Sequence, residues 1–233
     1  MKILSIDTSS KNCSVSIVDA SENNFEIIAL KNNDDEKTHS QKLMPLISEM
    51  FSEVNLTLDD INLLACSVGP GSFTGIRIGV STVKAFADVK NIPIASCTSL
   101  ESLAYNVEES GYIIPILDAK NNNVYSTIFH NREHIFENIA DDINTCLDKY
   151  VSFLPTTDSI FFVGDGSIIY KDLILEKFAN YNVNFSLDNI QSSLSLAKCA
   201  YNKYRLGMVG DSTSLTPIYL RKSQAERNLD GKQ

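Results

Sequence analysis

The sequence predicts an α/β protein built from two lobes that share one order of elements, β-β-β-α-β-α-β. The first observation is periodicity: short apolar runs alternate with longer stretches whose apolar residues recur every three or four positions. The second is that this order of elements occurs twice along the 233 residues. The third is a pair of short sequence matches between the two halves, which is typical of a duplicated chain.

The first half begins with two apolar runs, KILSID and CSVSIVDA, around the polar stretch TSSKN, which predicts two strands joined by a tight turn. Further along, two stretches have helical spacing, and a buried-strand pattern follows each of them. The predicted elements, in order, are strands 2–7, 13–20 and 25–32, helix 40–54, strand 61–68, helix 75–90, strand 92–97 and a further helix over 99–107.

The second half repeats this order. The tail after the last helix has no clear period, so we expect it to be irregular or partly helical. The predicted elements are strands 111–119, 124–130 and 133–140, helix 141–154, strand 159–166, helix 168–179, a weak strand 182–187, helix 193–207 and the tail 216–233.

Two alignments relate the halves. LSIDTSSKNCSVSIV lies over PILDAKNNNVYSTIF and pairs Asp7 with Asp118, and SVGPGS lies over FVGDGS and pairs Gly69 with Gly164. A duplicated lobe of this order resembles the RNase H-like lobes of the actin, hexokinase and Hsp70 (ASKHA) superfamily, which hold a ligand cleft between them. We therefore expect an N-terminal lobe at residues 1–98 and a C-terminal lobe with an irregular tail at 99–233.

Composition excludes several classes of protein. No apolar run approaches the ~20 residues that span a bilayer, and the N-terminus is too weakly apolar for a signal peptide, so we expect a cytoplasmic protein without membrane contact. The net charge of −9 argues against nucleic-acid binding by this chain alone. The five cysteines are scattered, as reduced, partly buried thiols would be.

A nucleotide-like cleft is one interpretation of two polar turns. Asp7, Thr8 and Ser9 end the first strand, where a carboxylate can hold a hydrated cation beside a phosphate; capping of the turn is the alternative. In GPGSFTG, the glycines permit positive φ and precede a helix whose N–H groups can bind an anion. Close helix–strand packing explains them equally well. The candidate cleft residues are Asp7, Thr8, Ser9, Gly69, Gly71, Gly75 and Asp118.

Two helices have more apolar surface than one packing face requires. Helix 75–90 has two apolar stripes on opposite sides, and the apolar arc of helix 40–54 covers roughly 160°, against the ~100° of a typical surface helix. A partner-binding surface is the favoured interpretation, and a broad core face is the alternative. The candidate interface residues are Leu43, Met44, Ile47, Met50, Phe51, Ile78, Thr82, Ala85 and Val89.

No catalytic grouping is evident. His130 and His134 have helical metal-ligand spacing, but they flank a turn between predicted strands, and four extended residues separate them by ~13 Å. We therefore predict no catalytic residue and no metal site in this chain.

The sequence resembles the bacterial TsaB (YeaZ) family over nearly the whole chain. The motifs that carry the resemblance are, in the family's order, ILSIDTSS, HSQKLMPLI, SVGPGSFTGIRIG, ILDAKNNNVY and LTPIYLRKSQAE. The resemblance implies a two-lobe actin-like ATPase fold and a role in forming N6-threonylcarbamoyladenosine at position 37 of tRNAs that read codons starting with A. It also implies a catalytic partner, TsaD, and a small ATPase, TsaE, that binds the pair. In that family the first two helices of the N-terminal lobe form the pairing surface.

The resemblance further implies that this chain is a non-catalytic scaffold and activator. At the positions of the metal-binding histidines of TsaD, this sequence has Ser99 and Leu103. No cofactor is then required by the chain itself, while ATP or ADP and magnesium belong to the complex, and tRNA is bound only through the complex. Alternatives are an independent ATP-binding phosphotransferase or protease of the superfamily, and an interaction protein that forms homodimers through the same helices.

Overall fold

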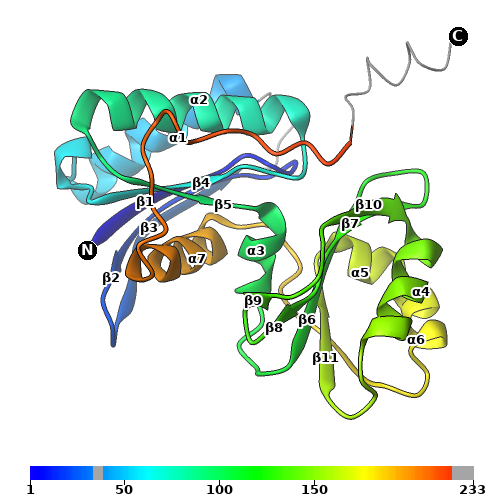
Figure 1. Ribbon diagram of the computed structural model, residues 1–233. Helices are drawn as coiled ribbons and strands as arrows, with labels where there is room; N and C mark the ends of the chain where they lie inside the picture. Colours follow the sequence, from blue (N-terminus) through cyan, green and yellow to red (C-terminus); the bar gives the residue numbers. More distant parts are fainter. Residues whose placement is uncertain (34–38, 222–233) are drawn as a thin grey trace, which may run out of the picture.

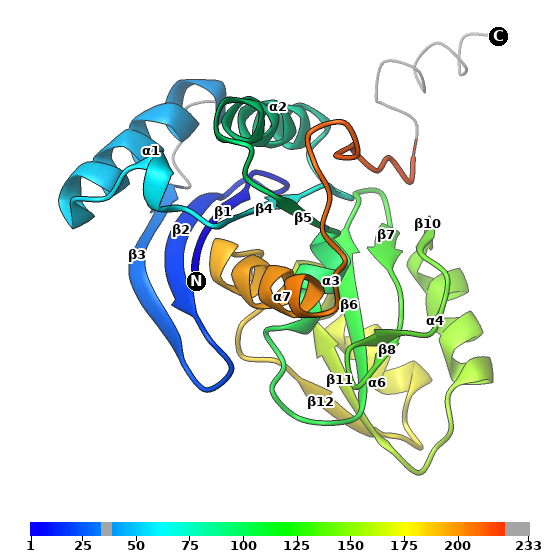
Figure 2. The same ribbon diagram turned by 60° about the vertical axis from the view of Figure 1, so that its left-hand side comes forward.

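The structure is a computed structural model that describes residues 1–33 and 39–221 (Figure 1). Two sheets with helices on both faces lie next to each other, which confirms the predicted α/β class (Figures 1 and 2). The first elements are β1 (Lys2–Asp7), β2 (Cys13–Ala20), β3 (Phe25–Asn33), α1 (His39–Val54), the 3₁₀ helix η1 (Leu58–Asp60), β4 (Leu63–Ser67), α2 (Phe73–Lys90), β5 (Ile94–Cys97) and α3 (Ser99–Ala104).

The remaining elements repeat this plan with shorter pieces. They are β6 (Tyr112–Asp118), β7 (Asn123–Ser126), β8 (Phe129–His130), β9 (Glu133–His134), β10 (Ile139–Asp142), α4 (Ile143–Phe153), β11 (Ser159–Val163), α5 (Asp165–Ile169), α6 (Lys171–Lys177), β12 (Asn182–Phe185) and α7 (Ser193–Arg205).

The first sheet has the strand order β3-β2-β1-β4-β5. β1 is antiparallel to β2 and parallel to β4, and β4 is parallel to β5. Because side chains alternate along a strand, Leu4 and Ile6 of β1 face α1 and α2, whereas Ile3 faces α7. Both faces of this sheet are therefore buried.

The second sheet has the order β10-β7-β6-β11-β12, with the β8–β9 hairpin beside β6. Helices α4 and α6 cover one face, where Tyr150 and Phe162 are fully buried. Helix α3 covers the other face through Leu100 and Leu103.

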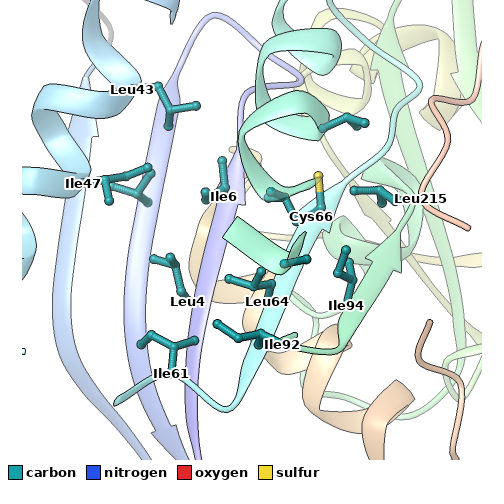
Figure 3. Packing of buried hydrophobic residues seen from close by; sticks show 14 of the residues in the cluster. Leu4, Ile6, Leu43, Ile47, Ile61, Leu64, Cys66, Ile92, Ile94 and Leu215 are labelled. Carbon is teal, nitrogen blue, oxygen red and sulfur yellow. The ribbon is translucent and has the colours of Figure 1, made fainter. Parts of the chain in front are cut away.

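The two lobes exchange helices. α3 follows the first sheet in sequence but packs on β6 of the second, and α7 follows the second sheet but packs on β1, β2 and β5 of the first. The segment after α7 also returns to the first sheet: Gly210 pairs with Ile94, and Leu215 is buried beside α2 (Figures 1 and 3). Residues 1–98 therefore do not contain every element packed on the first sheet, and the part of the expected tail at 222–233 lies outside the described residues.

Three predicted elements are divided in the structure. The strand expected at 133–140 is replaced by β9 and β10, which lie in different parts of the second sheet. The strand expected at 124–130 forms β7 and β8 in one register, with Ile116 opposite Ser126 and Ile113 opposite Phe129. Between these pairs lies Pro115, which has no N–H to donate to the ladder. The helix expected at 168–179 forms α5 and α6, because Tyr170 lies at φ −104° and ψ 21°, outside the helical region.

Candidate functional site

The residues at the end of β1 are buried, and hydrogen bonds join them to one another and to other segments of the chain. Asp7 Oδ1 accepts hydrogen bonds from the backbone N–H of Ser9 at 2.9 Å and from its hydroxyl at 2.6 Å. Ser9 Oγ in turn accepts a bond from Gln191 Nε2 at 2.8 Å. Asp7 Oδ2 is buried with no hydrogen-bond partner among the described residues. Burial raises the pKa of Asp7, and the bonds from Ser9 only partly oppose this shift.

The glycine loop closes directly on this turn. Ser72 N donates to Ser9 O at 2.7 Å, and Thr8 Oγ1 donates to Gly75 O at 2.7 Å. A Cβ at Gly71 would lie 2.2 Å from Ser9 O, and a Cβ at Gly75 would lie 2.1 Å from Thr8 O. Close backbone packing therefore accounts for both glycines without a ligand. Nucleotide binding in this cleft stays a prediction.

Gly69 is required for a different reason. Its φ is +100°, a conformation that favours glycine, and a Cβ there would lie 2.8 Å from Ile218 O. Ile218 N donates to Val68 O at 2.8 Å, so the chain after α7 is fastened to the start of the loop. The sequence reasoning treated this tail as irregular and did not place it here, because no local pattern indicates a contact across about 150 residues.

The matching turn of the second lobe holds Asp118. Its Oδ1 accepts a bond from Lys120 N at 3.0 Å, and its Oδ2 pairs with Lys120 Nζ at 2.6 Å. Asp165 Oδ1 accepts bonds from Asp118 N at 3.0 Å and from Gly166 N at 2.8 Å. The candidate cleft residues thus form two separate turns, one in each lobe.

The helices proposed as an interface are divided by burial. Leu43, Ile47 and Met50 are core residues, which corrects their assignment to an accessible surface: Figure 3 shows Leu43 and Ile47 pointing from α1 toward the first sheet. The broad-face alternative fits Leu43 and Met50, whereas Ile47 is buried but also lines the groove described next. Met44 is 49% exposed and Val89 72% exposed. Ala85 is also exposed, and Phe51, Ile78 and Thr82 are half-buried.

An apolar groove of about 580 Å³ lies on this exposed side. Met44 and Phe51 line it from α1, Phe86 from α2, and Leu56 and Leu58 from the segment that follows α1. The sequence reasoning missed the last three. Phe86 was missed because it lies between the two apolar stripes of α2. Leu56 and Leu58 could have been found, because these two apolar residues follow directly after the end of α1.

The aromatic start of α2 carries a further exposed cluster that sequence reasoning missed. The rings of Phe73 and Tyr219 stack with centroids 4.4 Å apart, and the Arg77 guanidinium lies 4.0 Å from the Phe73 centroid. Arg77 Nε donates to Tyr219 Oη at 2.8 Å. The tail thereby lies next to the α2 face.

The positions expected to correspond to metal ligands are buried and already engaged. Ser99 Oγ lies 3.1 Å from Ser67 Oγ, and Leu103 packs against Val163 and Phe129. A leucine side chain offers no ligand atom. Within residues 1–33 and 39–221 there is no cluster of three His, Cys, Asp or Glu side chains suited to a metal ion. In the same part of the chain, no helix is long and apolar enough to cross a membrane.

Solved structures share the two-lobed architecture. YeaZ from Pseudomonas aeruginosa has a TM-score of 0.70 at 20% identity, with 94% of this chain and 99% of that chain covered. A protein described as similar to peptidase YEAZ from Pseudomonas aeruginosa has a TM-score of 0.74 at 21% identity, with the same coverage. The chain therefore has the fold of YeaZ, an α/β fold with two sheets, in agreement with the α/β class that the sequence predicts.

Sequence relatives define the family. A model described as "TsaD: tRNA N6-adenosine threonylcarbamoyltransferase" matches residues 31–229. The tRNA threonylcarbamoyladenosine biosynthesis protein TsaB of Bacillus subtilis is 28% identical over 97% of this chain and 96% of its own length. TsaB of Buchnera aphidicola from Acyrthosiphon pisum is 31% identical over 82% of this chain and 76% of its own. The chain belongs to the TsaB family, within the broader group that the TsaD model describes.

Proposed function

We propose that this chain is the non-catalytic scaffold and activator of a bacterial complex that forms N6-threonylcarbamoyladenosine at position 37 of tRNAs reading codons that start with A. In this proposal a TsaD-like subunit transfers the threonylcarbamoyl group, and this chain pairs with it. The support is family membership over nearly the whole chain.

The observation that carries the partner role is the open apolar groove on α1 and α2. Monomeric proteins seldom expose large contiguous apolar patches. Here Met44, which is 49% exposed, lines the groove, and Val89 on the neighbouring helix is 72% exposed outside the groove lining. An amphipathic helix of the partner would place its apolar residues in such a groove.

A non-catalytic role agrees with the two turns. The glycine loop is filled by the backbone of Thr8 and Ser9, and Leu103 is a core residue of the second lobe. Transfer chemistry, together with any ATP, ADP or magnesium, is accordingly assigned to the complex. The proposal includes a TsaE-like ATPase as a further partner, tRNA contact through the complex only, and a homodimer through the same helices when the TsaD-like subunit is absent.

The test is binding of the TsaD-like subunit by Met44→Glu and Val89→Glu variants. A charge buried in the interface should weaken the heterodimer by at least about tenfold, or about 1.4 kcal/mol, measured by calorimetry, and should reduce tRNA modification in a reconstituted assay. Ile168→Glu is the matched control, because Ile168 on α5 is 49% exposed, like Met44.

Equal heterodimer affinity in Met44→Glu and the Ile168→Glu control would refute the interface assignment. Light scattering of the same variants without the partner tests the homodimer.

For the tRNA role, deletion of the gene should remove threonylcarbamoyladenosine from tRNA nucleosides analysed by mass spectrometry, and its persistence would refute the function. Tight magnesium-dependent ATP binding with turnover, abolished by Asp7→Ala, would favour the independent enzyme instead.

A further inference from the structure

A second cavity, of about 670 Å³, lies between the elements that the two lobes exchange. Its walls come from α3, from α7 and the residues after it, and from the β8–β9 hairpin. Small-molecule sites have this size and favour interfaces between domains. The groove on α1 and α2 shares no lining residue with this cavity.

Among the described residues, Arg132 is the basic group of this cavity that forms no ion pair. Its Nη2 donates to Val107 O at 2.8 Å, and its guanidinium lies 5.3 Å from the centroid of the Tyr105 ring. Among the described residues no carboxylate lies within ion-pair distance of it, although the chain has 29 acidic residues against 20 basic ones. An arginine in this position can hold a carboxylate or phosphate with two parallel hydrogen bonds.

The backbone at Arg132 is strained. Asn131 and Arg132 form the two-residue loop between β8 and β9, with φ of +50° and +69°. Such loops favour glycine at the second position, since a side chain there is disfavoured. The sequence keeps an arginine where glycine would fit better, which points to a role for the guanidinium.

The lysine and the histidine of the cavity already have partners. Lys203 Nζ donates to Glu101 Oε2 at 2.9 Å and to Ser96 O at 2.8 Å. His134 Nε2 lies 2.8 Å from Thr127 Oγ1. Glu133 is exposed at the edge and forms no ion pair within the described residues. Arg132 is therefore the cation that can accept an anionic ligand.

Four further lining residues are apolar, and two of them are exposed to solvent. Leu206 is 64% exposed and Met208 58% exposed, and both line the cavity together with Ala104 and Phe129. Apolar side chains facing a cavity gain contact area when a ligand covers them. A ligand that satisfies both parts of this lining has one anionic end and a compact apolar body.

We propose that this cavity binds a small amphipathic organic carboxylate, with its carboxylate on Arg132 and its apolar body against Leu206 and Met208. The site lies between the exchanged helices, so a bound ligand would hold the two lobes together. This inference is independent of the TsaD-like partner and can be tested on the chain alone.

The test is a titration with sodium benzoate, followed by two-dimensional NMR of the ¹⁵N-labelled chain. We expect saturable shifts in α3, in the β8–β9 hairpin and at residues 206–208. Benzamide, which has the same shape without the charge, should bind at least tenfold more weakly. Arg132→Gln should weaken benzoate binding at least tenfold, and the control Arg77→Gln, which removes the same charge from α2, should leave it unchanged.

Two further variants separate binding from folding. Arg132→Gly relieves the left-handed strain, so it should fold with a Tm within about 3 °C of the parent protein and still lose benzoate binding. Met208→Ala should weaken benzoate but leave inorganic phosphate unaffected, because phosphate has no apolar body. Absence of saturable shifts with benzoate, or equal binding by the parent protein and both Arg132 variants, would overturn the proposal.

Discussion

Each lobe has an aspartate at the end of its first strand, next to a glycine-rich loop that joins a later strand to a helix. We call these loops, around Gly69 in the first lobe and Gly164 in the second, the two joints, and their contacts differ. In both, the aspartate accepts a bond from the backbone N–H two residues on: Ser9 N to Asp7 at 2.9 Å, and Lys120 N to Asp118 at 3.0 Å. This shared geometry places the two turns in correspondence, as the sequence alignment of the halves predicts.

The joints differ in what closes them. In the second lobe, the side chain of Asp165 bridges Asp118 N and Gly166 N. The corresponding residue of the first lobe is Pro70, which has no such side chain, and there the backbone of Ser9 and the hydroxyl of Thr8 contact the loop directly. Both joints include close backbone packing, since a Cβ at Gly164 would lie 2.3 Å from Ile116 O. They differ at other glycines: the atom nearest to a Cβ at Gly75 is a backbone oxygen, whereas the atom nearest to a Cβ at Gly166 is a side-chain methyl carbon, which can move more easily.

The largest effect is therefore expected for Gly75→Ala. Its Cβ would lie 2.1 Å from the backbone oxygen of Thr8, and neither the strand turn nor α2 can move freely. We expect a loss of about 3 kcal/mol in the free energy of unfolding, measured by urea denaturation. For Gly166→Ala the nearest atom is Ile116 Cγ2 at 2.6 Å, a side-chain methyl that can shift, while the nearest backbone atom, Ile116 O, lies at 3.0 Å. A smaller loss of about 1–2 kcal/mol is therefore expected.

Gly207→Ala is the control for this pair, since its φ is +71° but nothing lies within 4 Å of the added Cβ. It should cost about 1 kcal/mol from backbone conformation alone. If Gly75→Ala is no less stable than Gly207→Ala, the first joint is looser than its contacts indicate and the comparison between the lobes fails.

The sequence predicted what depends on local pattern. The strands and helices of the first lobe lie close to their expected bounds, because each is long and strongly periodic. The division at Pro115 and at Tyr170 was missed, although a proline inside a strand is a readable signal. Periodicity also cannot show what covers an apolar face. The residues of α1 that pack on the sheet were therefore predicted to belong to the same interface as those that face solvent.

The packing of elements that are far apart in the chain could not be predicted from the sequence. The packing of α7 on the first sheet joins residues nearly 200 positions apart, such as Ile3 and Leu196. The contact of Ile218 with Val68 is of the same kind. Likewise, the aspartate turn could be located from its residues, but whether the glycines faced a ligand or another backbone required the folded chain.

An intermediate effect is expected for Asp7→Asn. Burial raises the pKa of Asp7 above its unfolded value, so the folded state favours the protonated form. The stabilisation from this proton is complete below about pH 4, the unfolded value, and is lost as the pH rises through the folded pKa. Asparagine has no charge to desolvate, so the variant should gain about 1 kcal/mol relative to the parent protein at pH 7.

The control for this pH dependence is Asp118→Asn, whose carboxylate pairs with Lys120. The difference in stability between Asp7→Asn and the parent protein should shrink as the pH falls from 7 to 4, whereas Asp118→Asn should show no gain at pH 7. Thermal unfolding across this range measures both. A gain for Asp7→Asn that is the same at every pH would mean that the charge of Asp7 is not its cause.

The smallest effect is expected for Lys120→Ala, and it tests whether the second turn depends on its ion pair or on its backbone. The Lys120 side chain is 78% exposed, so its ammonium gains little from Asp118 in water. The backbone bond from Lys120 N to Asp118 Oδ1 survives the substitution. We therefore expect a Tm within about 1 °C of the parent protein. Ser9→Ala at the corresponding position should lower the Tm by several degrees. It removes the buried hydroxyl that donates to Asp7 and accepts from Gln191 Nε2, although the backbone bond from Ser9 N to Asp7 remains. A larger loss for Lys120→Ala than for Ser9→Ala would mean that the exposed ion pair, and not the shared backbone turn, holds the second joint.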